Sequence, residues 1–202
     1  TCAIFASAWL MSFKLNTRKF ANLKAEQDKI SIDILSSETQ FDLRTDNTCD
    51  AQSVFSKDLA TLAEKISFSE SNVTSSQEIA VLKKQYTLLE VRDYLLGKRV
   101  AEGCKKAFTS ILYFYGTSEG CPDCVKQSYV LDALRAKYPA LRVYSFDYNL
   151  DLSTIKALTS IYKVQDTLPG LVVQGKTSSG FKTLEEIEKL LPKELINQAK
   201  KK

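Results

Sequence analysis

The 202-residue sequence contains no histidine, and its five cysteines include only one C-x-x-C pair, Cys121-Pro122-Asp123-Cys124. Zinc knuckles use the same spacing, and structural zinc sites take four ligands, drawn mainly from cysteine and histidine. Without histidine or a second C-x-x-C, a zinc site would need Cys49 and Cys104 from distant parts of the chain. These absences favour a dithiol/disulfide pair with no bound metal. A four-cysteine zinc site and an inert structural disulfide are the alternatives.

The sequence also lacks internal repeats, low-complexity tracts and a concentrated basic face. Its net charge is +4, and the closing lysines 200–202 are typical of a frayed tail. Nucleic acid is therefore not an expected partner. The chain is 44% hydrophobic and 26% charged, which is ordinary for a globular protein, and its length allows one medium domain plus attachments.

No apolar run is long enough to cross a membrane alone. The longest, Cys2–Phe13, has 12 residues, whereas a membrane span needs about 20. Because the sequence starts with Thr1 and not Met, this run predicts a truncated membrane anchor or signal-anchor over residues 1–19. A buried core helix and a signal-peptide remnant are the alternatives. The basic residues Lys14, Arg18 and Lys19 would by themselves hold the following segment in the cytoplasm.

The C-x-x-C pair lies between a predicted strand and a predicted helix. The apolar run Ser110–Gly116 precedes it, and a helical pattern runs from Val125 to Lys137. A helix N-terminus presents unpaired N–H groups and a partial positive charge, so it favours thiolate over thiol. The thiolate attacks disulfides, and a second cysteine three positions on can close an intramolecular disulfide and release the partner. This chemistry requires no metal and no organic cofactor.

Alternating and helical patterns continue after the motif. They predict a strand over 141–147, a helix over 151–162, a strand over 171–174, a turn at Gly175-Lys176, a strand over 177–181 and a last helix capped by Thr183. The predicted order is β-α-β-α-β-β-α, which places this part of the chain in the α/β class.

That order, with C-x-x-C after the first strand and Pro169 opening the third, resembles the thioredoxin fold over about residues 107–199. The resemblance implies that Cys121 is the exposed nucleophile and Cys124 the buried resolving thiol. It also implies that Leu168 offers backbone groups to an extended substrate peptide, beside a cis peptide bond to Pro169. The alternative for Pro169 is an ordinary trans proline at the start of an edge strand.

The sequence departs from the thioredoxin pattern in two places. Many thioredoxins carry a buried acid on the strand before the motif, but residues 112–115 include no carboxylate. Gly120 replaces the tryptophan that commonly precedes the first cysteine. We therefore expect proton transfer to run through water, Asp123 or Glu119, whose negative charges oppose thiolate formation. Asp123 and Glu119 as plain solvated loop residues are the other interpretation.

Residues 49–105 predict an αα-hairpin. Two amphipathic segments, 53–68 and 76–96, are joined by a polar stretch, and Gly97 and Gly103 are placed to end the second helix. A Cys49–Cys104 disulfide would then close the open end of the hairpin; two free buried thiols are the alternative. Because such bonds persist in oxidising compartments, this pairing places the domain outside the cytoplasm.

The sequence thus divides into an anchor (1–19), a stalk or linker (20–48), a helical hairpin (49–105) and a thioredoxin-like domain (106–202). We expect a membrane-anchored, extracytoplasmic (periplasmic or cell-surface) thiol–disulfide oxidoreductase. Its partners would be protein thiols and disulfides, a redox partner protein, and the membrane through the N-terminal segment. The alternative is a non-catalytic binding or assembly module that uses the hairpin and the Leu168-Pro169 groove.

Overall fold

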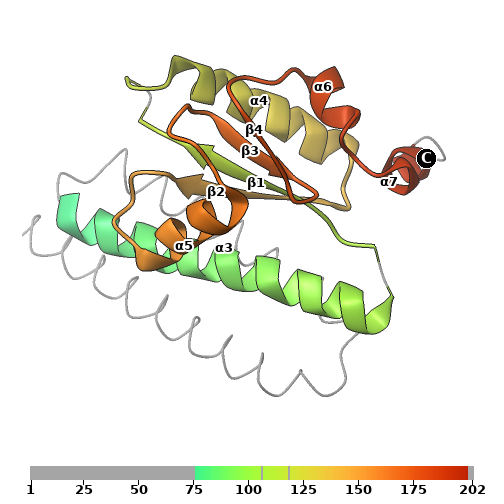
Figure 1. Cartoon of the computed structure of the whole chain (residues 1–202), viewed down its shortest axis with the longest axis horizontal. Helices are drawn as coiled ribbons and strands as arrows, with labels where there is room; N and C mark the ends of the chain where they lie inside the picture. Colours follow the sequence, from blue (N-terminus) through green and yellow to red (C-terminus); the bar gives the residue numbers. More distant parts are fainter. Residues whose placement is uncertain (1–75, 106, 118, 200–202) are drawn as a thin grey trace, which may run out of the picture. The chain divides into compact units, whose positions relative to one another are not determined.

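The computed structural model describes residues 76–105, 107–117 and 119–199 (Figure 1). The chain divides into two compact units, residues 1–48 and 49–202, and every described residue belongs to the second. The predicted anchor, the stalk and the first helix of the hairpin lie outside the described residues and stay predictions. Among the helices that are described, none is long and apolar enough to cross a membrane.

The described chain alternates helices and strands. In order, the elements are α3 (Ser76–Cys104), β1 (Thr109–Tyr115), α4 (Pro122–Lys137), β2 (Leu141–Asp147), α5 (Ser153–Tyr162), β3 (Gly170–Val173), β4 (Lys176–Ser179), α6 (Leu184–Glu188) and α7 (Lys193–Ala199). The predicted α/β class is therefore confirmed. The predicted last helix is divided into α6 and α7, because Pro192 cannot donate the backbone hydrogen bond that a continuous helix would need.

The strands form one four-stranded mixed sheet in the order β2-β1-β3-β4. Strands β1 and β2 are parallel, whereas β3 runs antiparallel to β1 and β4 antiparallel to β3. Because β1 is central, its carboxyl end lies between the ends of its neighbours. The loop that carries the cysteine pair leaves from this carboxyl end.

Side chains of β1 alternate between two hydrophobic clusters, as the two-residue period of a strand requires. Ile111 and Tyr113 join one cluster together with residues of α4, α6 and α7. Leu112 and Phe114 join the other, together with residues of α3 and α5. Figure 1 shows the same division, with α4 and α6 on one side of the sheet and α3 and α5 on the other. The sheet is thus covered on both faces.

Two local signals are found close to their predicted positions. Thr183 forms a capping box with Glu186, in which each side chain bonds the other residue's backbone N–H. The β3–β4 turn consists of Gln174 and Gly175, with φ of 51° and 76°. A two-residue hairpin turn with both φ values positive suits the twist of the strands, so the turn lies one residue before the predicted Gly175-Lys176.

Helix α3 runs through Gly97, so the prediction that this glycine ends the helix is wrong. Gly103 directly precedes the last residue of the helix, Cys104, close to the predicted end. Gly97 is buried, and a β-carbon placed on it would lie 2.3 Å from Cε2 of Phe108. The missing side chain therefore opens a notch in α3 that receives the Phe108 ring. Gly97 serves helix packing, which its sequence alone does not distinguish from helix termination.

Polar contacts fasten α3 to β2, which is an edge strand of the sheet. The backbone N–H of Ser145 donates to Oε1 of Glu90 at 3.0 Å, and the Tyr144 hydroxyl donates to Oδ2 of Asp93 at 2.6 Å. Both acids are buried, at 3% and 6% exposure. Burial raises the pKa of Glu90 to about 8, although the Ser145 N–H works in the opposite direction. Neither acid was predicted from the sequence to have a role.

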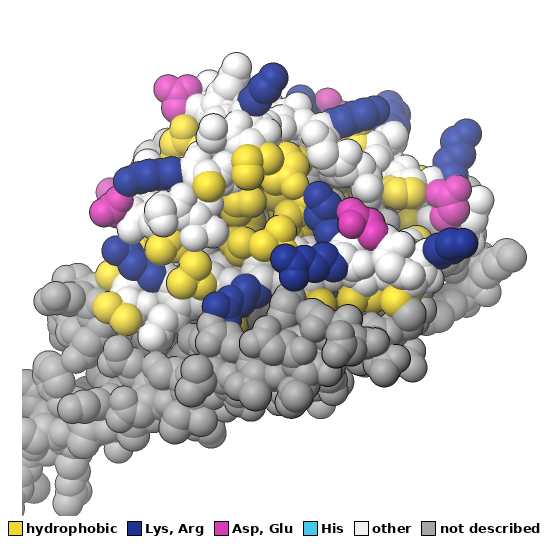
Figure 2. Space-filling view, turned by 60° about the horizontal axis from the view of Figure 1, so that its bottom comes forward, with side chains coloured by type: hydrophobic (Ala, Val, Ile, Leu, Met, Phe, Trp, Pro, Cys, Tyr) yellow, Lys and Arg dark blue, Asp and Glu magenta, His cyan; other side chains and the backbone are white. Residues whose placement is uncertain are grey.

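The surface of this part of the chain is not uniformly polar. Figure 2 shows hydrophobic side chains gathered at the centre of one face, with lysine and arginine side chains and a few acidic ones around them. On the described helices, the most exposed large apolar side chains are Tyr129 of α4 and Ile161 of α5, at 71% and 69%.

Candidate redox site

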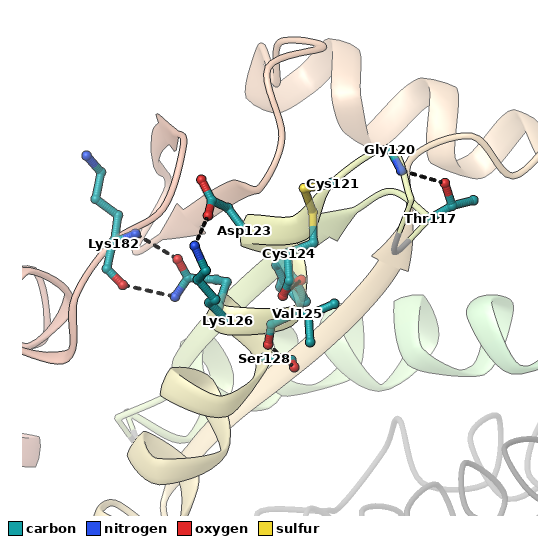
Figure 3. The surroundings of a disulfide bond; sticks show 11 residues. Thr117, Gly120, Cys121, Asp123, Cys124, Val125, Lys126, Ser128 and Lys182 are labelled. Atoms are coloured by element: carbon teal, nitrogen blue, oxygen red, sulfur yellow. Dashed lines mark hydrogen bonds and ion pairs between the residues drawn. A yellow bond between two sulfur atoms is a disulfide. The ribbon is translucent and has the colours of Figure 1, made fainter.

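Cys121 and Cys124 form a disulfide at the N-terminus of α4, with their Cα atoms 5.3 Å apart (Figure 3). Cys121 is the N-cap residue, and Pro122 is the first residue of the helix. Proline is well suited to this position, because its ring fixes a helical φ where no backbone donor is needed. The prediction that the two cysteines stand at the start of a helix, after a strand and a short loop, is confirmed.

Two backbone N–H groups of the loop before the disulfide donate hydrogen bonds to Thr117. The N–H of Cys121 donates to the carbonyl oxygen of Thr117 at 2.8 Å, and the N–H of Gly120 donates to the Thr117 Oγ1 atom at 3.3 Å. Figure 3 shows the second of these contacts beside the disulfide. These two hydrogen bonds to Thr117 stabilise the turn between the end of β1 and the N-terminus of α4.

Both cysteines are buried in the disulfide form. Cys121 is 5% exposed and Cys124 is 3% exposed, and both belong to the core cluster under α4. The resemblance to thioredoxins implied an exposed Cys121, and this expectation is wrong for the oxidised state. The physical reason is packing: Cys121 belongs to a core cluster against which the partly buried Leu168 also packs.

Leu168 and Pro169 lie beside the disulfide. A β-carbon on Gly116 would also lie 3.1 Å from Cδ1 of Leu168, so Leu168 and Cys121 pack against one glycine. The Leu168-Pro169 peptide bond is cis, the isomer favoured from the sequence, and the Pro169 side chain is buried. The structure therefore brings together Cys121, Cys124 and the Leu168-Pro169 segment.

Asn149 also lies at this site, although no prediction from the sequence included it. Its Nδ2 atom would lie 4.0 Å from the same added β-carbon on Gly116. Asn149 follows β2, which is parallel to β1, and the carboxyl ends of adjacent parallel strands meet at one edge of the sheet. That rule, which places ligand sites of α/β sheets at this edge, is the signal that could have identified Asn149 from the sequence.

Tyr113 forms a hydrogen bond with the backbone of Cys124. Its hydroxyl donates to the carbonyl oxygen of Cys124 at 2.6 Å, and the contact is buried. Burial raises the pKa of Tyr113 to about 12, so the hydroxyl keeps its proton near neutral pH. Residues 112–115 include no carboxylate, so the polar group that this strand brings to Cys124 is a neutral hydroxyl, which no prediction from the sequence included.

The acid inside the motif faces solvent. Asp123 forms an ion pair with Lys126 at 2.8 Å, and both side chains are more than half exposed. Figure 3 shows this contact on the outer side of α4. Glu119 is exposed as well. Proton transfer through Asp123 or Glu119 stays a prediction.

Cys104 at the end of α3 is disulfide-bonded. Its predicted partner, Cys49, lies outside the described residues, so the Cys49–Cys104 pairing stays a prediction. Within the described ranges, no three cysteine, aspartate, glutamate or histidine side chains gather in a group that would hold a metal ion.

No protein-family model matches the chain, and no curated protein matches it. Among solved structures, the chain is similar to one described as "Structure of a malarial protein", with 19% sequence identity and a TM-score of 0.36. The match covers 45% of this chain and 99% of that chain. A likeness at this TM-score carries no argument about fold or function.

Proposed function

We propose that this protein is a thiol–disulfide oxidoreductase with a thioredoxin-like domain over residues 106–202. The observation that supports this proposal most directly is the Cys121–Cys124 pair at the N-terminus of α4, packed beside Leu168. In thioredoxin-like proteins such a pair exchanges electrons with cysteines of other proteins. Protein thiols and disulfides are therefore the substrates we propose.

The reaction needs only the two sulfurs and those of the partner. In the reduced protein, the Cys121 thiolate attacks a partner disulfide, forms a mixed disulfide and expels one partner thiolate. The Cys124 thiolate then attacks the Cys121 sulfur, which forms the Cys121–Cys124 bond and expels the second partner thiolate. The partner gains two electrons and the protein loses two. A redox partner protein reverses the change, and the reduction potential of the pair decides the direction of flow.

Three features of the site favour this chemistry. The N-terminus of α4 stabilises negative charge on sulfur, because its first N–H groups have no intrahelical acceptor. Leu168 precedes β3 at the site, where its backbone groups would pair with an extended segment of the partner. Pro122 and Thr117 fix the loop, so little of it has to be ordered when a partner binds.

The low exposure of both cysteines favours a second candidate function. In the disulfide form Cys121 is only 5% exposed, so little of its surface is accessible to a sulfur atom of a partner protein. The alternative is therefore a non-catalytic binding or assembly module, in which the disulfide is structural and partners bind the Leu168-Pro169 groove or the hairpin that includes α3.

We further propose that the domain is held at a membrane on its extracytoplasmic side, with residues 1–19 as the anchor. The apolar run Cys2–Phe13 supports an anchor. The disulfide-bonded state of Cys104 supports an oxidising compartment, because the cytoplasm keeps such thiols reduced.

Insulin reduction by dithiothreitol, with and without the protein, separates the two functions. We expect the wild-type protein to accelerate the reaction and Cys121→Ser to abolish the acceleration. Cys124→Ser should accumulate a mixed disulfide with its substrate, seen as a reducible adduct on a gel. Acceleration that survives Cys121→Ser would reject the catalytic assignment. A wild-type protein with no effect on the rate would support the binding module.

A further inference from the structure

We propose that Tyr113 is a positioning residue for the redox reaction: its hydroxyl holds the first turn of α4 so that Cys124 can attack Cys121 in a mixed disulfide. This inference rests on the proposed function, and it assigns a role to a residue outside the C-x-x-C motif.

The backbone of Tyr113 is held in place by strand pairing on both sides. β1 is bonded on both sides, and Tyr113 is paired in register with Ser145 of β2 and Leu171 of β3. Its side chain is 4% exposed and belongs to the same core cluster as both cysteines. From this position its hydroxyl donates to the Cys124 carbonyl at 2.6 Å. A rigid strand is thereby linked to the backbone of the residue that must attack.

This link matters most when the disulfide is open. In the mixed disulfide Cys121 is bonded to the partner, so the bond between Cys121 and Cys124 no longer holds the helix terminus together. The first turn of a helix is its least constrained part, because its N–H groups lack intrahelical acceptors. A contact between Tyr113 and the Cys124 backbone keeps this turn in place, and the rate of an internal attack depends strongly on such placement.

Tyr113 acts by placement and not by moving a proton. Burial raises the pKa of its hydroxyl to about 12, so it remains a donor at any pH at which the thiols exchange. The hydrogen bond ends on the carbonyl oxygen of Cys124 and leaves the thiol chemistry to the sulfur. The role therefore differs from that of a buried acid, which takes up the thiol proton.

The test separates the two attacks in time. Reduced protein is mixed with one equivalent of the aromatic disulfide of thionitrobenzoate, which releases a coloured thiolate at each step. The first release reports attack by Cys121, and the second reports attack by Cys124. A Cys121→Ser protein serves as the blank for other thiols. We expect Tyr113→Phe to slow the second release about fivefold, which corresponds to about 1 kcal/mol, with the first release unchanged.

Tyr138→Phe is the matched control. Tyr138 belongs to the same core cluster at the opposite end of α4, and its hydroxyl donates to Oε1 of Glu188 at 2.7 Å. We expect both releases to keep wild-type rates in this variant. An unchanged second release in Tyr113→Phe, or an equal slowing in Tyr138→Phe, would overturn the inference.

The outcome for Tyr113 can be told apart from that of the proposed function. If the wild-type protein shows both releases and Tyr113→Phe slows the second, but the wild-type protein does not accelerate insulin reduction, the proposed function fails and the role of Tyr113 in the internal attack stands. If the wild-type protein accelerates insulin reduction and Tyr113→Phe keeps the wild-type second release, only the inference fails. A wild-type protein with no second release would overturn both.

Discussion

Leu168 lies over Gly116, with its Cδ1 atom 3.1 Å from the point where a β-carbon on Gly116 would stand. The Cβ atom of Cys121 lies 3.6 Å from the same point. A glycine at the end of β1 thus lets the loop before β3 approach the start of α4. The cysteine pair and the Leu168-Pro169 segment share a site because no side chain separates them.

Replacing Gly116 by alanine should change reactivity more than stability. The new methyl group requires Leu168 to move by a few tenths of an ångström, and this shift alters the surface beside Cys121. We expect insulin reduction to slow severalfold, with a loss of unfolding free energy of about 1 kcal/mol. Gly103→Ala in α3 is the control, because nothing lies within 4 Å of its added methyl group. Equal rates for the two variants would argue against a role for the Gly116 contact.

The two glycines of α3 should respond to alanine in opposite directions. At Gly97 the added methyl group would collide with the Phe108 ring, and overpacking of this kind costs about 1–3 kcal/mol. At Gly103 nothing lies within 4 Å, so alanine should stabilise the helix by roughly 0.5–1 kcal/mol. Urea unfolding of both variants measures the difference. A Gly97→Ala protein as stable as Gly103→Ala would show that Phe108 leaves its notch at no cost.

Stability should fall as the pH rises from about 5 to 8. Glu90 has a pKa of about 8 when folded, against 4.5 as a free side chain, so in this window the folded state holds a proton that the unfolded chain lacks. The free energy of unfolding then decreases by at most about 1.4 kcal/mol per pH unit, and Glu90 contributes no further decrease above its folded pKa.

Glu90→Gln tests this assignment, because glutamine keeps the oxygen that accepts from Ser145. We expect denaturant unfolding of this variant to depend much less on pH over the same window. Asp93, whose pKa burial also raises, should account for part of the remaining slope, and adding Asp93→Asn should flatten the curve further. A slope that Glu90→Gln leaves intact would place the bound proton elsewhere.

Gln127 should be important for stability, although it lies one turn from the cysteines. Its side chain is fully buried and makes two hydrogen bonds with the backbone of Lys182, at 2.8 and 3.2 Å. Gln127→Leu removes the partner of the partly buried N–H and C=O groups of Lys182, at a cost of about 1 kcal/mol for each lost hydrogen bond. The adjacent Ser128→Ala, which removes an exposed contact, should change stability by less than about 0.5 kcal/mol. Similar unfolding midpoints would contradict this assignment.

The regular elements of the α/β domain could be predicted from sequence because their patterns are local. The alternation over 141–147 gave the bounds of β2, and the spacing after Cys124 gave α4 up to Lys137. Thr183 was recognised as a cap because the capping box is encoded within four residues. The fold class followed from these patterns.

The contacts between distant segments could not be predicted in the same way. The Phe108 ring that fills the notch at Gly97 and the pairing of Glu90 with the β2 edge depend on how α3 packs, which no local pattern records. At the site, the cysteines, Leu168 and Pro169 were recognised through their motif. Tyr113 was missed because a buried tyrosine in a strand has the pattern of an ordinary core residue.

Exposed N–H and C=O groups along a sheet edge are a template on which strands of other molecules can add. Here Glu90 already occupies the N–H of Ser145 on one edge, and the opposite edge, β4, is only four residues long. The domain should consequently resist polymerisation through strand addition while α3 remains docked. Detachment of α3, and not reduction of the cysteine pair, would be the event that makes aggregates grow.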